Sequence, residues 1–277
     1  MFENIVVGID GREGGRDAVA LACTLGGEAA TITLVQAFPL EGTRYDLIAR
    51  REVESELATV LADRPDVERI AVGDTSPARA LHDLAAEHGA QVIVIGSCRR
   101  GPVGRVLLGD VSRSTLHGAA CPVVVAPHGY RDHPFPIRVI GVGFDGTEAS
   151  AGALATADRI AAAEHAGLRV LTAVAPQPVP VAAMAYPVAY DLDATRAGAH
   201  AAADAELRGA VAPLACNAAV ETLDGHPVAL LERLTEQVDL MVVGSRGYGA
   251  LRRVVLGSTS DRLAHRAACP LMVVPGA

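Results

Sequence analysis

The 277-residue chain carries the same ordered set of short motifs twice. NIVVGIDG near the start returns as RVIGVGFDG, which places Asp10 and Asp145 135 residues apart. VIVIGS, VLLGD and HGAACPVVVAP return in the same order as LMVVGS, VVLGS and HRAACPLMVVP, now 148 residues apart. Ordered motifs whose offset changes only once are typical of a duplicated unit. The sequence therefore predicts two homologous domains.

We expect a first domain at 1–128, a second at 137–277 and a linker at 129–136, where prolines interrupt regular structure. The offset grows from 135 to 148, so the second unit has 13 additional residues, which we place in the Ala/Pro-rich stretch 175–190.

In each unit, short apolar or β-branched runs alternate with helical patterns. The expected strands are 5–9, 31–37, 67–72, 92–95 and 123–126, then 139–144, 169–174, 219–223, 240–243 and 271–274. The helices of the first unit are expected at 16–25, 47–61, 78–88 and 111–117. Apolar strands separated by helices imply a parallel sheet covered on both faces. The predicted fold class is α/β, with two tandem, doubly wound, five-stranded, Rossmann-like domains.

Composition excludes several classes of protein. Half of the residues are hydrophobic and 20% are charged, as in a globular protein, and the net charge is −8. That charge argues against a nucleic acid or an anionic membrane as partner. The start lacks a signal-peptide pattern, and no apolar run reaches the roughly 18 residues of a membrane span. Five cysteines show no CxxC and no metal spacing, so we expect a cytoplasmic protein with reduced thiols and no bound metal.

A glycine-rich loop follows the fourth strand of the second unit. Gly244, Gly247 and Gly257 form a G-x2-G-x9-G pattern that Ser258 closes. Glycine lets backbone N–H groups approach phosphate oxygens, and Gly257-Ser258 opens a helix whose N–H groups favour an anion. The hydroxyls of Ser258 and Ser260 can add donors. The loop is neither a Walker A motif nor a Rossmann fingerprint.

Together, the G-x2-G-x9-G-S loop, the G-x-D that ends the first strand and the ACPVVVVP-like last strand resemble the universal stress protein family. The resemblance covers the whole chain, once in each unit. The duplicated arrangement resembles the tandem-domain members of the family. It implies adenine-nucleotide binding, pairing of domains through their last strands, and a role in stress survival or dormancy. It implies no defined reaction.

Carried over to the second unit, the resemblance places Asp145, preceded by Gly143 and Phe144, against the adenosine. It assigns the adenine edge to the backbone of Val174. The ribose–phosphate loop it implies consists of Val243, Gly244, Gly247, Gly257, Ser258 and Thr259.

The first unit departs from this pattern. Asp10 and Ala37 keep the adenosine-side positions, and Gly96 and Gly109 keep the loop spacing. Arg99 stands where a glycine is expected, with Gly101 nearby, and Asp110 replaces the serine. Asp110 can be a helix N-cap, can repel a triphosphate, or can share a magnesium ion with it. Arg99 can pair with a phosphate or lie in solvent.

Other conspicuous residues receive structural interpretations. Asp10 and Asp145 lack a partner base, so a ligand-positioning or turn-forming role is favoured over acid catalysis. Cys121 and Cys269 are interpreted as small buried hydrophobes, and His117 and His265 as interacting with helix C-termini. Arg105 and Arg253 have two possible interpretations, a contact with phosphate or a place on a solvated helix face.

The predicted function is therefore that of a non-enzymatic stress-response protein that binds ATP, with or without Mg²⁺. It would act through nucleotide-dependent conformation, on a second copy of itself or on other protein partners. A nucleotide-independent interaction scaffold and a slow ATP hydrolase remain alternatives.

Overall fold

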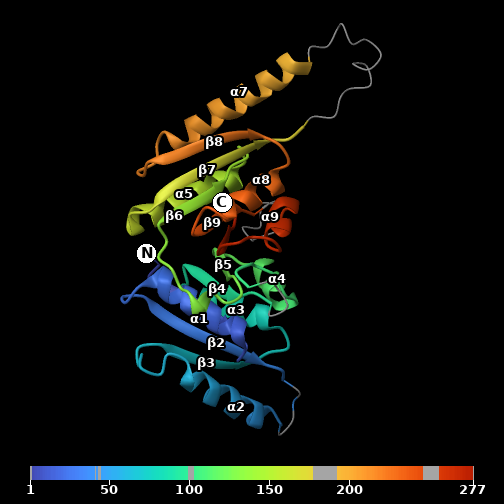
Figure 1. Cartoon of the computed structure of the whole chain (residues 1–277). Coiled ribbons are helices and arrows are strands. Elements are labelled where there is room, and N and C mark those ends of the chain that lie inside the picture. Colours follow the sequence, from blue (N-terminus) through green and yellow to red (C-terminus); the bar gives the residue numbers. More distant parts are fainter. Residues whose placement is uncertain are drawn as a thin grey trace.

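The computed structural model describes residues 2–40, 42, 45–98, 103–176, 192–245 and 256–276. Within them, ten strands form a single sheet in the order β3-β2-β1-β4-β5-β10-β9-β6-β7-β8 (Figure 1). The strands of the first domain are β1 (Asn4–Ile9), β2 (Thr31–Phe38), β3 (Glu68–Gly73), β4 (Val92–Gly96) and β5 (Val123–Ala126). Those of the second are β6 (Val139–Gly143), β7 (Gly167–Val174), β8 (Ala218–Asp224), β9 (Leu240–Gly244) and β10 (Leu271–Val274).

Helices connect the strands in both halves. In the first they are α1 (Glu13–Gly26), α2 (Tyr45–Thr59), α3 (Pro77–Glu87) and α4 (Asp110–Leu116). In the second they are α5 (Glu148–Glu164), α7 (Leu192–Val211), α8 (Pro227–Thr235) and α9 (Ser258–Leu263). None of these helices is long and apolar enough to cross a bilayer.

The two halves join through their last strands. Pairing is parallel within each half, and β5 and β10 pair antiparallel. Val124 lies opposite Met272, its own counterpart in the second domain, so the pseudo-two-fold axis passes between them. Each half has the order 3-2-1-4-5 of a doubly wound sheet. The predicted fold class and the pairing of last strands are confirmed.

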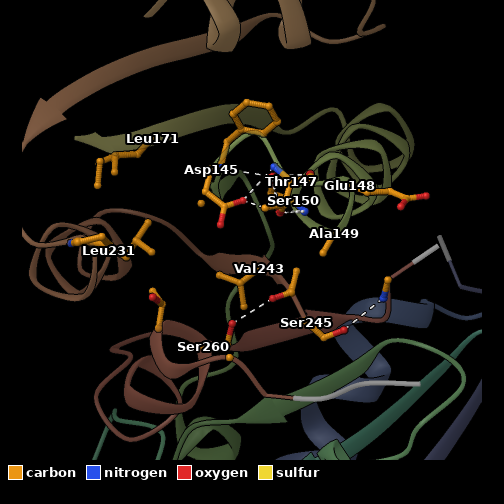
Figure 2. A pocket seen from close by; sticks show the side chains of 18 residues that line it. Asp145, Thr147, Glu148, Ala149, Ser150, Leu171, Leu231, Val243, Ser245 and Ser260 are labelled. Carbon is orange, nitrogen blue, oxygen red and sulfur yellow. Dashed lines mark hydrogen bonds between the residues drawn. The ribbon is translucent and has the colours of Figure 1, made fainter. Parts of the chain in front are cut away.

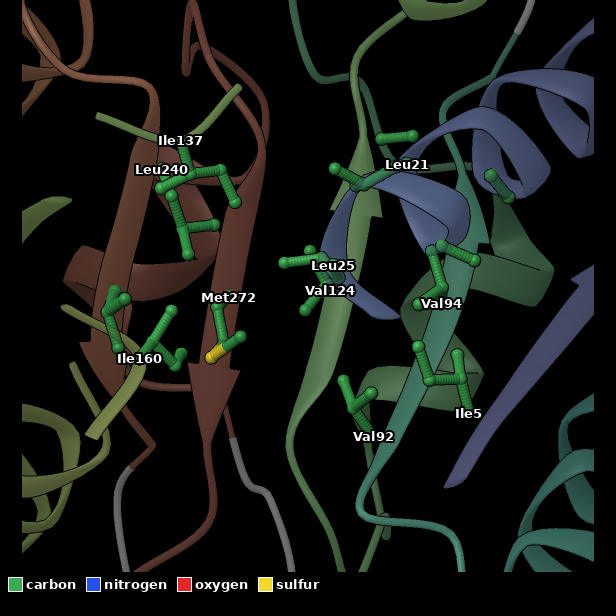
Figure 3. Packing of buried hydrophobic residues seen from close by; sticks show 14 of the residues in the cluster. Ile5, Leu21, Leu25, Val92, Val94, Val124, Ile137, Ile160, Leu240 and Met272 are labelled. Carbon is green, nitrogen blue, oxygen red and sulfur yellow. The ribbon is translucent and has the colours of Figure 1, made fainter. Parts of the chain in front are cut away.

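A hydrophobic core covers each face of this sheet, because the central strands are buried on both sides. One core packs α1, α2, α5 and α7 against residues such as Val94, Val124, Leu240 and Met272 (Figure 3). The other packs α3, α4, α8 and α9 against residues such as Val123, Val125, Leu271 and Val273. Both cores contain residues of both domains, so the chain folds around a shared sheet.

The connection between the domains is docked on α1. Asp17 is fully buried and accepts hydrogen bonds from the backbone N–H groups of Gly129 (2.9 Å) and Arg131 (3.0 Å). Tyr130 is also buried, packs edge-on against Phe135 and donates to the Phe135 carbonyl at 3.1 Å. Residues predicted as a simple linker thus hold a short 3₁₀ turn, Tyr130–Asp132, with specific contacts to the first domain.

Candidate functional site

The second domain has a cavity of about 710 Å³ at the carboxyl ends of its parallel strands. β6 lies between β7 and β9, so the connections after β6 and β9 leave toward opposite faces and open a crevice there. Figure 2 shows around it side chains from β7, β9, α5, α8 and α9 and from the residues that follow β6. The lining residues are Gly143, Phe144, Asp145, Thr147, Glu148, Ala149, Ser150, Leu171, Ala173, Pro227, Leu231, Val243, Gly244, Ser245, Gly257, Thr259, Ser260 and Gly276.

Asp145 is held in place at the start of α5. Its Oδ1 accepts from the Thr147 hydroxyl at 2.6 Å and from the Thr147 N–H at 3.2 Å. Thr147 is also the N-cap of α5, because its Oγ1 accepts from Ser150 N at 3.2 Å. The carboxylate is therefore oriented by the same hydroxyl that starts the helix, which gives Asp145 a turn-forming role (Figure 2). Its contact with a ligand stays a prediction.

The first glycine of the loop has a packing role. A Cβ on Gly244 would overlap the carbonyl oxygen of Ala149 at the start of α5, and a Cβ on Gly96 would overlap that of Gly14 at the start of α1. Strand and helix approach too closely here for any side chain. Glycine at these two positions is thus explained without a ligand.

The last glycine of the loop is different. Gly257 has φ −73° and ψ 162°, a conformation open to any residue. Its counterpart Gly109 has φ −85° and ψ 176°, and an added Cβ would meet only Cys98 Cβ, at 3.7 Å. Neither backbone conformation requires glycine, and at Gly109 neighbouring atoms do not require it either. Both residues line cavities, and at Gly109 the space left by the missing side chain is open to a ligand.

The hydroxyl of Ser260 is already used within the fold. It donates to the Gly244 carbonyl at 3.0 Å, and Ser112 donates to the Gly96 carbonyl at the same distance. Ser260 thus ties α9 to the end of β9, which corrects the expectation that its hydroxyl adds a donor for a ligand. Thr259 lines the cavity, whereas Ser258 does not.

Val174 does not line the cavity. Its carbonyl accepts from Gly225 N at 2.9 Å, beyond the end of the cavity wall. Ala173 lines the cavity and is the seventh residue of β7, as Ala37 is of β2. Val174 ends β7 as predicted, but β2 ends at Phe38, one residue beyond its predicted end at Ala37. The two residues chosen as strand ends are therefore not equivalent, and the counterpart of Ala37 is Ala173. Gly247 and Arg253 lie outside the described residues.

The first domain has an equivalent cavity of about 730 Å³, which contains Asp10, Ala37, Gly96 and Gly109. Asp10 Oδ1 accepts from Arg12 N at 3.0 Å. Asp110 and Val111 line this cavity at the positions of Ser258 and Thr259. A carboxylate and an isopropyl group thus replace two hydroxyls. Arg99 and Gly101 lie outside the described residues.

Sequence reasoning missed the residues that close the second cavity from the sides. Leu171 and Leu231 provide apolar walls from β7 and α8, and Thr147 and Ser150 provide hydroxyls from α5. Only Thr147 had a sequence signal, since a Thr before an acidic first turn and an Ala-rich helical run is an N-cap pattern. The apolar walls look like ordinary core residues in the sequence.

Cys269, just before β10, is buried as expected, whereas Cys121, just before β5, is half-buried. Burial raises the pKa of the Cys121 thiol to about 11 and raises that of Cys269 further. Thiols of this kind are unreactive. The described residues contain no group of three or more His, Cys, Asp or Glu side chains that could hold a metal ion.

Arg105 reaches the other domain, where it contacts the Arg266 carbonyl at 2.8 Å and Glu236 at 3.0 Å.

The chain matches the sequence model of the "Universal stress protein family" twice, over residues 1–127 and 136–275. A universal stress protein of Mycobacterium tuberculosis is 27% identical over 225 residues, which cover 78% of this chain and 75% of that protein. One from Mycolicibacterium smegmatis is 33% identical over 200 residues, covering 72% and 66%.

The crystal structure of a universal stress protein from Archaeoglobus fulgidus superimposes with a TM-score of 0.66 at 19% identity and covers 99% of both chains. At this level of identity the superposition shows a shared fold over the full length of both tandem domains.

Proposed function

This chain belongs to the universal stress protein family, and on that premise we propose that it binds ATP in the cavity of its second domain. The observation that carries the proposal is the combination of an oriented carboxylate, Asp145, and a cavity-lining glycine at the start of α9, Gly257, in one crevice at the switch point of the sheet. In open α/β sheets this crevice is where ligands bind.

The residues present fit a nucleotide in both chemistry and size. Ligand cavities are typically about 300–1,000 Å³, and this one has about 710 Å³. Leu171, Ala173 and Leu231 would contact the adenine ring, and Asp145 would accept hydrogen bonds from ribose hydroxyls. The backbone at Gly257 and Thr259 would approach the phosphates. We assign no protein ligand to the Mg²⁺ that accompanies ATP.

The proposed mode of action is binding and signalling, without a reaction. ATP would favour one conformation or assembly state, and a second copy of the chain or another protein would recognise that state. Such a shift requires different ATP affinities in the two states. We place the protein in the cytoplasm, since its five cysteines are all unpaired.

To test this proposal, the purified protein is denatured, and the nucleotide that it releases is identified and its amount per chain is measured. Calorimetric titration with ATP of the wild type and of Gly257→Val then assigns the site. Valine can adopt the φ of Gly257, so the variant should fold and should lose ATP binding at the second domain. Unchanged affinity in a folded Gly257→Val protein would remove the assignment.

The two alternatives give different results in the same experiments. A nucleotide-independent scaffold releases no nucleotide and shows no binding heat. A slow hydrolase turns over added ATP, and Gly257→Val abolishes that turnover. Binding without turnover supports the proposed function.

A further inference from the structure

A third cavity lies in the first domain, on the face of the sheet opposite the nucleotide-type cavity. It has a volume of about 300 Å³ and lies between α1, α2 and β2. Its lining residues are Ile9, Gly11, Arg12, Gly15, Arg16, Val19, Gln36, Ser55, Glu56, Thr59 and Val60. Only Ile9, Arg12 and Gly15 also line the larger cavity. This smaller cavity has no role in the function proposed above.

Gln36 is the first unusual residue of this cavity. It is only 6% exposed, in the middle of β2, where a buried strand normally carries an apolar side chain. Its Nε2 donates to Glu56 Oε2 at 2.8 Å. Its Oε1 is buried and has no hydrogen-bond partner among the described residues. A buried acceptor without a donor is costly and requires an explanation.

Two arginines are the second unusual feature. Arg12 is the N-cap of α1, and Arg16 follows one helical turn later, with its N–H on the Arg12 carbonyl at 3.3 Å. Both side chains are exposed, and neither forms a side-chain hydrogen bond or an ion pair with another described residue. Two like charges one turn apart repel each other, and cations at a helix N-terminus oppose its dipole.

The second domain shows that the fold does not need this arrangement. Thr147 takes the place of Arg12 and caps α5 through its hydroxyl, whereas α1 has no side-chain cap. Ala151 takes the place of Arg16, each being the fourth residue of its helix. In the first domain, the two guanidinium groups beside this cavity therefore come with the loss of a helix cap and with repulsion between two cations. Violations of local rules of this kind cluster at functional sites.

We propose that this cavity binds a small acidic amino acid, a molecule with two carboxylates and one ammonium group. Arg12 and Arg16 would pair with the carboxylates, for which guanidinium groups are the preferred partners. Glu56 and the Gln36 carbonyl would accept from the ammonium group. The two cations and one anion of the wall match a ligand with two anions and one cation.

The size of the cavity supports this class of ligand. A volume near 300 Å³ is at the small end of ligand cavities, which suits a free amino acid better than a nucleotide. The charge arrangement also disfavours inorganic phosphate, because the Glu56 carboxylate would repel it.

Calorimetric titration of the full chain with L-glutamate and with glutarate, which lacks the ammonium group, tests the proposal. We expect saturable L-glutamate binding at one site per chain, tighter than about 1 mM, and glutarate binding at least about tenfold weaker. Arg16→Ala should weaken L-glutamate binding about tenfold or more. It should leave thermal stability equal or higher, since it removes a repelling charge. Arg51→Ala, an exposed arginine of α2 outside the cavity lining, is the matched control and should bind normally.

Glu56→Gln should lower the affinity for L-glutamate and leave that for glutarate unchanged or higher. The Gly257→Val protein should bind L-glutamate as the wild type does, which separates this site from the ATP cavity. Absence of L-glutamate binding, equal binding of glutarate, or full affinity in Arg16→Ala would each overturn the proposal.

Discussion

Arg113 and Asp261 occupy the same position in the two domains, the fourth residue of α4 and of α9, and they pair with each other, with Nη2 3.3 Å from Oδ1. Arg113 Nη2 also lies 2.7 Å from His265 Nε2. Contact between counterparts places both near the pseudo-two-fold axis. A dimer of two first domains would set arginine against arginine, and one of two second domains would set aspartate against aspartate. Because the domains share one chain, they carry complementary charges that a symmetric dimer cannot have.

Charge reversal tests this pair. Arg113→Asp and Asp261→Arg should each lower the free energy of unfolding, and the double variant should recover most of the loss. The side chains are 48% and 34% exposed, so we expect a coupling of about 0.2–1 kcal/mol that decreases with salt. Urea unfolding of the four proteins at two salt concentrations measures it. Losses that simply add in the double variant would show that the pair is not coupled.

The two nucleotide-type cavities should differ in affinity for ATP. Two unit charges about 4 Å apart interact by roughly 4 kcal/mol at an effective dielectric of 20. Here the two charges are the Asp110 carboxylate and a phosphate of ATP. Because Asp110 is exposed, we take a third of this repulsion energy, about 1.4 kcal/mol, which is tenfold in affinity. ATP should bind the first domain at least tenfold more weakly, and the difference should narrow for AMP.

Calorimetry on Asp110→Ser checks this expectation, because the variant should recover part of the lost affinity. Two equal, tight ATP sites in the wild type would refute it. Weaker binding in Asp110→Ser would indicate that the carboxylate holds magnesium.

The glycines of the first-domain loop should respond differently to alanine. In Gly96→Ala the new Cβ overlaps the Gly14 carbonyl, and forcing apart such close packing costs roughly 1–3 kcal/mol. In Gly109→Ala the nearest atom is 3.7 Å away, so stability should stay within about 0.5 kcal/mol of wild type. Thermal or denaturant unfolding compares the two. Similar losses of stability in both variants would show that the close contact of Gly96 with Gly14 does not set the cost of the substitution.

Removal of the Asp17 carboxylate should destabilise the connection between the domains. Asp17→Ala leaves the N–H groups of Gly129 and Arg131 without their buried acceptor, at a cost of roughly 2–4 kcal/mol. Asp17→Asn retains one carbonyl oxygen and should lose less. Hydrogen exchange at these two amides, together with chemical unfolding, measures the effect. An alanine variant as stable as wild type would refute the anchoring role.

Thiol alkylation should depend on pH at Cys121. Burial raises its pKa to about 11, so the reactive thiolate is about one part in a thousand at pH 8. Since the folded-state pKa is raised, the alkylation rate should increase about tenfold per pH unit until the pH approaches that value. Mass spectrometry after timed labelling follows Cys121 against free glutathione. Labelling of Cys121 as fast as glutathione at pH 8 would contradict its raised pKa.

The sequence predicted the fold closely because the information is local and repeated. Apolar runs marked every strand, and β5 (Val123–Ala126) and β10 (Leu271–Val274) coincide with their predicted ranges. The duplication doubled each signal. Strand ends were less certain. β2 ends at Phe38, one residue beyond its predicted end, whereas β7 ends at Val174 as predicted, so the contacts expected at the two strand ends, Ala37 and Val174, are not equivalent residues.

Within the site, the sequence indicated Gly257 because a glycine that opens a helix lets backbone N–H groups approach a phosphate. It indicated Asp145 through the resemblance to the family. It could not distinguish a glycine needed for helix packing, such as Gly244, from one that leaves room for a ligand. That difference depends on the distance between β9 and α5, which is set by packing across the whole sheet.

The sequence by itself determined the duplication, the α/β class, the order of elements and the loop with its switch-point aspartate. Only the tertiary structure decided the apolar walls at Leu171 and Leu231, the pairing of Arg113 with Asp261, and the cavity around Gln36. Periodicity and motifs act over a few neighbouring residues, whereas these contacts join segments far apart in the chain. Their geometry follows from the register of ten strands and the docking of helices on both faces, which no local pattern encodes.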